Sequence, residues 1–225
     1  MKNIYIYCEG QTEESFINNV LCPYLLEVGI YTRPIVCRTK QTVEKKYRGG
    51  VSNYFKIKDE LIRLCRQHKN ETLTTMFDYY GLPLNTPGLK DKTGSLFDRV
   101  ARIEQAINDD IGMGNMFFNL TIHEFEGLLF SNTSQFSTIT DEETIHKLQN
   151  IKESFQTPEY INDSKETAPS KRLESLIPGY AKVSNGTIIS MRIGIDTILG
   201  ECEHFNSWIS KIRSFATLPS IPNKW

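Results

Sequence analysis

Short runs of β-branched and aromatic residues alternate with helical segments through the first half of the chain. Four runs are predicted as strands, at residues 3–8, 33–38, 73–77 and 116–122. Between them, apolar residues recur at helical spacing and predict helices at 13–29, 54–68 and 96–107. Because strands that alternate with helices usually form parallel sheets, this order predicts an α/β fold with a four-stranded, mainly parallel sheet.

The second half of the chain shows helical patterns only. We predict helices at 123–130, 141–155, 170–177, 187–200 and 202–215. The change of pattern predicts an α/β core at 1–130 and a helical C-terminal subdomain at 131–225, packed on that core. Within the first predicted helix, Pro23 is expected to kink or divide the helix.

Charge and cysteine content narrow the class of protein. The 26 Lys and Arg nearly balance the 27 Asp and Glu, which argues against a protein that coats nucleic acid non-specifically. No apolar run approaches the roughly 18 residues that span a bilayer, and the N-terminus lacks a signal-peptide pattern. The five cysteines are widely spaced and form no CxxC pair, which predicts neither a disulfide framework nor a zinc site. We expect a cytoplasmic protein that does not enter a membrane.

Acidic residues stand where the predicted strands end. Glu9 follows the first strand, Asp78 ends the third, and Glu124 and Glu126 follow the fourth. The carboxyl ends of parallel strands meet at one edge, and strands one and three are neighbours in a flavodoxin-like order. Glu13 lies one helical turn after Glu9. We therefore predict that these carboxylates converge.

Converging carboxylates indicate a metal site. Without cationic partners they would repel one another, and a divalent cation relieves that repulsion. Oxygen-only ligation suits Mg²⁺, Mn²⁺ or Ca²⁺ better than zinc, and we expect Mg²⁺ or Mn²⁺, which can promote phosphodiester hydrolysis. The competing interpretation is that each acid only caps the following helix.

Basic residues open a later predicted helix. Lys171 and Arg172 follow Pro169, where cations oppose the helix dipole unless they face an anion. We predict that both contact a substrate phosphate and that Lys182 also stabilises developing phosphate charge. Alternatively, Lys171 and Arg172 are solvated surface cations.

Six ordered segments carry a resemblance to a known family. They are CEGQTEESF (8–16), FDYYGLP (77–83), HEFEGLLF (123–130), TAPSKRL (167–173), IPGYAK (177–182) and CEHFNSW (202–208). In these segments the chain resembles the bacterial TOPRIM-like domain of unknown function 4276 family. That family is related to the TOPRIM domain of overcoming-lysogenization-defect nucleases.

The resemblance implies a TOPRIM-like, Rossmann-like fold and a Mg²⁺ or Mn²⁺ cofactor. Glu9 takes the position of the conserved TOPRIM glutamate, Glu13 that of the family's second acid, and Asp78 that of the first Asp in an Asp-x-Asp pair. Tyr80 stands where the second Asp is expected. The resemblance also implies a nucleic acid substrate, an AAA-type ATPase encoded nearby and a role in anti-phage defence.

Two classes of function stay open at this point. One is a metal-dependent nuclease, in which Glu9, Asp78 and Lys182 act on DNA or RNA. The other is a non-catalytic TOPRIM-like module that senses a ligand or regulates an ATPase partner. A phosphatase acting on small nucleotides would use the same residues. The sequence leaves the oligomeric state and the choice between DNA and RNA open.

Overall fold

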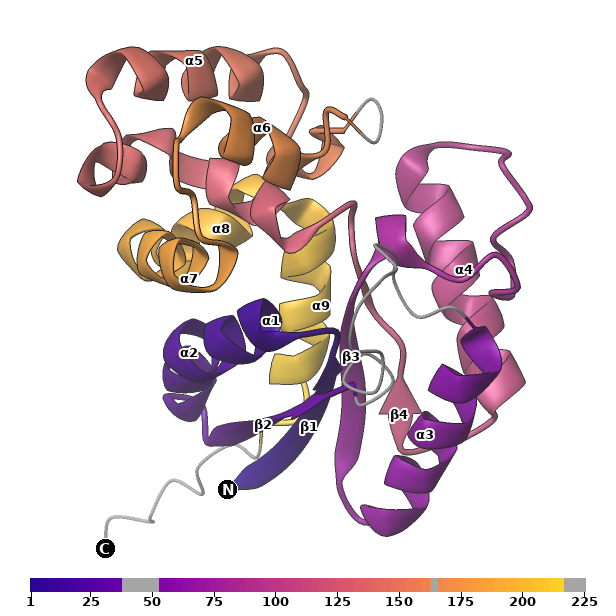
Figure 1. Cartoon of the computed structure of the whole chain (residues 1–225). Coiled ribbons are helices and arrows are strands. Elements are labelled where there is room, and N and C mark those ends of the chain that lie inside the picture. The colour runs from indigo at the N-terminus through magenta and orange to yellow at the C-terminus, as the bar shows by residue number, and fades with distance from the viewer. Residues whose placement is uncertain (38–52, 163–165, 217–225) are drawn as a thin grey trace, which may run out of the picture.

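A parallel β-sheet forms the centre of the structure, a computed structural model that describes residues 1–37, 53–162 and 166–216 (Figure 1). Its strands are β1 (Lys2–Cys8), β2 (Ile30–Val36), β3 (Thr72–Asp78), β4 (Met116–Phe117) and β5 (Leu120–Thr121). The order is β2-β1-β3-β4, β5 also pairs with β3, and every pairing is parallel. The predicted α/β class and parallel sheet are confirmed, in agreement with a TOPRIM-like fold.

The strand predicted at 116–122 is divided into β4 and β5. Between the two, the Thr75 hydroxyl accepts a hydrogen bond from Asn119 N at 2.8 Å and donates to Asn119 O at 2.7 Å. The Phe118 N–H donates to Asn108 Oδ1 at 2.7 Å. Side chains thus satisfy backbone groups that a continuous ladder would have paired.

The first predicted helix is divided into three parts, α1 (Gln11–Phe16), the π-helical η1 (Ile17–Leu21) and α2 (Cys22–Leu26). Pro23 lies in the first turn of α2, where its missing N–H and its ring do not fit a continuous α-helix. The wider π turn directly before it marks the division. The division expected at Pro23 is therefore present as a change from π- to α-helical hydrogen bonding, while the backbone at Leu21 and Cys22 stays right-handed helical.

Helices cover both faces of the sheet (Figure 1). On one face lie α3 (Tyr54–Gln67) and α4 (Leu96–Ile111), and on the other lie α1, α2 and α9 (Glu203–Arg213). Alternate residues of β1 belong to the two apolar clusters on the two faces of the sheet. Ile4 and Ile6 belong to one cluster, and Tyr7 belongs to the other. This alternation is the two-residue period of a strand buried on both sides.

The C-terminal part is helical, as predicted. It contains η4 (Phe125–Thr138), α5 (Glu142–Glu153), η5 (Pro158–Tyr160), α6 (Pro169–Leu176), α7 (Lys182–Ile193), α8 (Ile195–Glu201) and α9. The helix predicted at 123–130 is instead the 3₁₀ segment η4, and Gly194 divides the helix predicted at 187–200. Gly194 has φ 78° and ψ 146°, a positive-φ conformation that glycine adopts readily and that does not continue a helix.

The helical part packs on the sheet through α9. The Trp208 Nε1–H donates to Thr74 Oγ1 of β3 at 2.9 Å, and both residues are buried. The same apolar cluster contains Ile4 of β1 and Trp208 of α9. The boundary at residue 130 stays a prediction. In the described part of the chain, every helix is too short or too polar to cross a bilayer.

Candidate functional site

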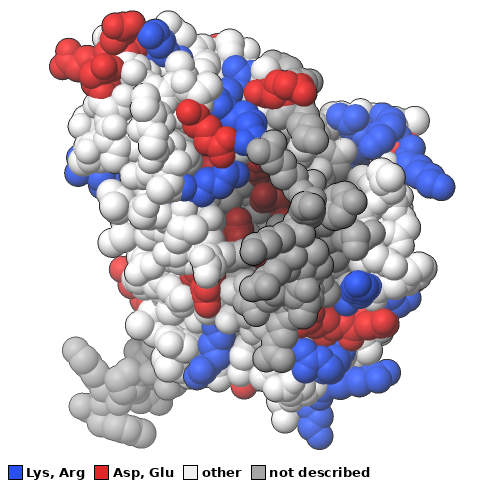
Figure 2. Space-filling view, in the orientation of Figure 1, with Lys and Arg blue, Asp and Glu red and all other residues white. Residues whose placement is uncertain are grey.

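Five carboxylates from three separate segments lie at the carboxyl edge of the sheet. Glu9 follows β1, Glu13 lies in α1, Asp78 ends β3, and Glu124 and Glu126 stand at the start of η4. In the orientation of Figure 2, acidic atoms lie at the bottom of a hollow, with basic atoms close to them. The register explains the convergence, because Cys8 pairs with Met76 and Thr121 pairs with Asp78.

Backbone hydrogen bonds connect the three segments. Asp78 N donates to Glu9 Oε2 at 3.3 Å, and Phe125 N donates to Asp78 Oδ1 at 3.2 Å. Glu124 Oε2 accepts from Ser170 N, at the start of α6, at 3.1 Å. The carboxylates after β1, at the end of β3 and at the start of η4 therefore each accept a hydrogen bond from the backbone of another segment.

The protein environment makes three carboxylates of the cluster hard to ionise, those of Glu13, Asp78 and Glu126. Burial raises the pKa of Asp78 well above its usual range, and repulsion from Glu9, Glu13 and then Glu126 adds to the effect. Burial and the charge of Glu9 raise the pKa of Glu13 to about 7. Burial also raises the pKa of Glu126, although Lys182 opposes the shift. The cluster therefore holds more negative charge than its surroundings stabilise.

Lys182 is a cation beside this cluster. Its Nζ lies 3.5 Å from Glu126 Oε1; the lysine side chain is 41% exposed and the glutamate side chain 4%. Burial lowers the pKa of Lys182, but attraction to Glu126 and Glu124 outweighs burial, so the pKa is raised. Lys182 therefore stays positively charged, with its side chain partly open to solvent.

Lys171 and Arg172 contact groups of the protein itself. The Lys171 ammonium pairs with Glu174 one turn further along α6. Arg172 Nε donates to Thr167 O at 2.7 Å, and its guanidinium lies 5.4 Å from the centre of the Phe155 ring. The anion at the start of α6 is the Glu124 carboxylate. That Lys171 and Arg172 bind a substrate phosphate stays a prediction.

Two residues near the cluster were not assigned a site role from sequence. The Tyr180 hydroxyl is buried and has no hydrogen-bond partner among the described residues; burial and Glu126 raise its pKa. In the sequence, only its position two residues before Lys182 indicates that Tyr180 lies near the site. His123, directly before Glu124, has φ 62°, which is strained for a non-glycine residue. Its Nδ1 lies 3.2 Å from Asn162 Nδ2.

The donor chemistry fits Mg²⁺ or Mn²⁺, whereas the side-chain geometry is not preset for a metal. Within residues 1–37, 53–162 and 166–216, no three His, Cys, Asp or Glu side chains form a metal-ligating group. The converging donors are nonetheless all carboxylate oxygens, which such ions prefer. Binding would relieve the repulsion that raises the pKa of Asp78 and Glu13, but it requires these side chains to reorient.

The pKa of Glu13 predicts how stability depends on pH. The folded protein keeps this proton up to about pH 7, whereas the unfolded chain loses it near 4.5. Because the folded state binds more protons, its stability falls as pH rises through this window, by up to about 3 kcal/mol. We expect metal-free protein to melt at a lower temperature at pH 8 than at pH 5, and Mg²⁺ to restore more stability at pH 8.

Thermal unfolding followed by circular dichroism, in EDTA and in Mg²⁺, measures this effect. Glu13→Gln isolates the contribution of one residue and should flatten the pH dependence between about 4.5 and 7. A Glu13→Gln protein with the wild-type pH dependence would show that Glu13 does not titrate as described.

The fold and the site together define a class of ligand-binding α/β proteins. A parallel α/β sheet with polar groups gathered at the carboxyl ends of its strands is the arrangement in which such proteins bind ligands. Residues 8–213 match the family described as "Domain of unknown function (DUF4276)", so the chain belongs to this family. This match confirms the resemblance found in the sequence.

The chain is also similar in fold to a solved structure. The chain resembles the C-terminal region of the OLD protein of Xanthomonas campestris pv. campestris, with 16% identity and a TM-score of 0.41. The similarity covers 95% of this chain and 96% of that one, and it concerns the fold alone. No curated protein matches the chain.

Proposed function

We propose that this protein is a divalent-metal-dependent nuclease that hydrolyses phosphodiester bonds in DNA or RNA. The observation that carries the proposal is the convergence of Glu9, Glu13, Asp78, Glu124 and Glu126 at the carboxyl edge of the sheet. A site for a phosphate anion needs positive charge, and a carboxylate cluster of this kind acquires it by binding a dication. The family's resemblance to TOPRIM domains supports the same activity.

Each residue has a role in this proposal. Glu9 and Asp78 hold the metal, and Glu13, Glu124 and Glu126 complete its surroundings. When bound, Mg²⁺ or Mn²⁺ would supply charge neutralisation and an activated water. Lys182 stabilises the negative charge that develops on the phosphate oxygens. From the resemblance to this family we also propose that the protein acts in the cytoplasm, works with an AAA-type ATPase and takes part in anti-phage defence.

The direct test is a cleavage assay on single-stranded DNA, duplex DNA and RNA. Each substrate is incubated with Mg²⁺, Mn²⁺ or EDTA, with and without the neighbouring ATPase. Cleavage that needs the metal and disappears in EDTA supports the proposal. Metal-independent cleavage, or none with any substrate and partner, contradicts it.

Replacement of Lys182 tests the cation in the site. We expect Lys182→Ala to lower kcat about 10²- to 10³-fold, because a positioned charge no longer stabilises the transition state. Lys182→Arg should retain part of the activity. Steady-state cleavage rates measure both. Lys147→Ala is the matched control, because Lys147 is an exposed lysine of α5 paired with Glu143, and it should cleave like wild type. Normal cleavage by Lys182→Ala would remove the residue from the mechanism.

A non-catalytic module is the second candidate, favoured by two observations. Tyr80 replaces the second acid of the TOPRIM pair, and no metal-ligating group is preset within the described ranges. Calorimetric titration of Mn²⁺ into wild type and Asp78→Asn, paired with the cleavage assay, separates the two. Metal binding without cleavage, even with the ATPase present, favours the module.

A further inference from the structure

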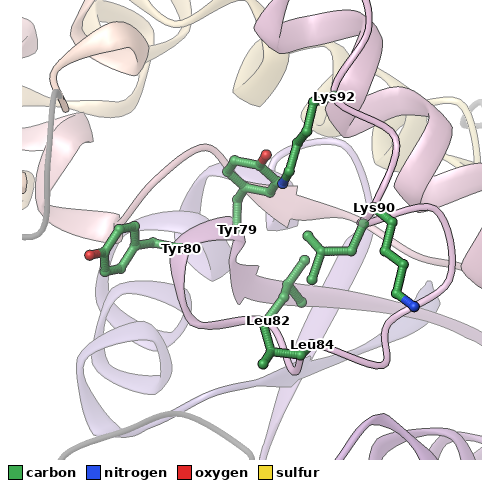
Figure 3. A pocket seen from close by; sticks show the side chains of 7 residues that line it. Tyr79, Tyr80, Leu82, Leu84, Lys90 and Lys92 are labelled. Atoms are coloured by element: carbon green, nitrogen blue, oxygen red, sulfur yellow. The ribbon is translucent and has the colours of Figure 1, made fainter.

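A pocket lies beside the carboxylate cluster, in the loop that follows β3. Its volume is about 500 Å³, within the range of small-molecule sites. Figure 3 shows the side chains that line it, with the Tyr80 ring extending to the opposite side from Leu82, Leu84, Lys90 and Lys92. The lining residues are Tyr79, Tyr80, Leu82, Leu84, Leu89, Lys90 and Lys92.

The lining combines apolar and aromatic walls with two cations. The Tyr80 side chain is 42% exposed and Leu84 is 88% exposed, so apolar surface stays open to solvent. Lys90 and Lys92 form no ion pair or hydrogen bond with any residue that the structure describes. Asp91 between them pairs with Arg102, at 3.2 Å between Oδ2 and Nε, which leaves a local excess of positive charge.

The pocket and the carboxylate cluster share one stretch of backbone. Tyr79 and Tyr80 directly follow Asp78 in the 3₁₀ turn η3 (Tyr79–Gly81). Tyr80 N donates to His123 O at 3.2 Å, and a Cβ placed on Gly81 would lie 3.6 Å from Glu9 Oε1. A ligand in the pocket would therefore lie next to the site where cleavage is proposed.

We propose that this pocket binds an unpaired nucleotide of a single-stranded nucleic acid. The base stacks on a tyrosine, and Lys90 and Lys92 contact the adjoining phosphates. Aromatic side chains combined with cations are the usual means of binding single strands, because every base has a face that can stack. Bases inside a duplex have both faces covered by their neighbours, so only an unpaired strand fits.

The assignment of this pocket rests on the proposed nuclease function, because it names the class of substrate that the same site would bind. Tyr80 takes the position of the second TOPRIM acid, so the position serves substrate binding instead of metal binding. DNA and RNA single strands offer the same stacking and phosphate chemistry. Separate DNA and RNA probes distinguish them.

The test measures binding apart from cleavage. Fluorescence anisotropy is recorded in EDTA with labelled oligo-dT and oligo-U of about 15 nucleotides, and with a duplex of equal length. We expect the better single strand to bind at least about tenfold more tightly than the duplex. Tyr80→Ala should weaken single-strand binding about tenfold or more, and Tyr80→Phe should restore it.

The lysines are tested through salt dependence. A Lys90→Ala/Lys92→Ala protein should bind more weakly, and its slope of log K against log salt should be smaller by about 1.4. Lys69→Ala/Lys147→Ala is the matched control, since it removes two exposed lysines elsewhere and should bind like wild type.

The outcomes separate the two proposals. Equal or tighter duplex binding, no binding to any nucleic acid, or wild-type binding by Tyr80→Ala overturns the assignment of the pocket, whether or not the protein cleaves. Single-strand binding that depends on Tyr80, in a protein that cleaves nothing with any metal, supports the pocket and refutes the nuclease.

Discussion

Asp78→Asn is expected to reduce nucleic acid cleavage at least about 10³-fold while the protein stays folded. A metal-binding carboxylate contributes to several kcal/mol of transition-state stabilisation, and about 4 kcal/mol corresponds to 10³ in rate. Asparagine keeps the oxygen that accepts from Phe125 N, at 3.2 Å from Asp78 Oδ1 in the native protein. The substitution therefore removes the charge and preserves the local hydrogen bond.

The same variant should melt at an equal or higher temperature in EDTA. Burial and repulsion from Glu9 and Glu13 raise the pKa of Asp78, which means that its negative charge destabilises the fold. Loss of activity combined with retained or increased stability is a pattern that general misfolding does not produce.

Cleavage rates and melting temperatures are measured for Asp78→Asn and Glu9→Gln beside a matched control. Asp141→Asn is that control, because Asp141 caps α5 through Thr144 N and asparagine caps equally well. It should match wild type in both measurements. Full activity in Glu9→Gln would refute the assignment of the site. A marked fall in the stability of Asp78→Asn would contradict the inferred repulsion between Asp78 and the carboxylates of Glu9 and Glu13.

Trp208→Ala is expected to lower the free energy of unfolding by about 3–5 kcal/mol. The side chain is 4% exposed and packs between α9 and the sheet, with its ring 5.5 Å from that of Phe205. Truncation leaves a cavity and removes the hydrogen-bond donor to the buried Thr74 hydroxyl. The substitution should therefore destabilise the central strand β3 as well as α9.

Urea denaturation followed by circular dichroism measures this cost. Trp208→Phe keeps most of the apolar volume and should lose about 1–2 kcal/mol, chiefly the hydrogen bond to Thr74. Phe55→Ala removes a 59% exposed aromatic side chain of α3 and should change stability by less than about 0.5 kcal/mol. Separate unfolding of the helical part in Trp208→Ala, with the sheet undisturbed, would show that the two parts do not fold as one unit.

Several features of the site follow from local sequence pattern. Glu9 and Asp78 each stand at the end of an apolar run, and parallel pairing of β1 with β3 places such ends at one edge. The alternation of strands with helices predicted a parallel sheet, and a flavodoxin-like strand order then made β1 and β3 neighbours. Pro23 likewise predicts a division of the first helix, because its ring and missing N–H act locally.

Other features depend on partners that are distant in the chain. The strand at 116–122 is divided because Thr75 bonds Asn119, and the start of α6 is occupied by Glu124 instead of an external anion. Neither partner differs from an ordinary polar residue in its own sequence neighbourhood. The same holds for the contact between Trp208 and Thr74.

Sequence alone determined the α/β class, the order of the elements, the family and the set of acids at strand ends. These depend on periodicity, on local backbone chemistry and on ordered motifs, all of which can be read along the chain. Tertiary structure alone decided that Lys182 pairs with Glu126, that the Glu124 carboxylate occupies the start of α6, and that a pocket with two lysines adjoins Asp78. The reason is physical: charge pairing and pocket shape depend on distances in space, and residues far apart in the chain set them only once packing has brought them together.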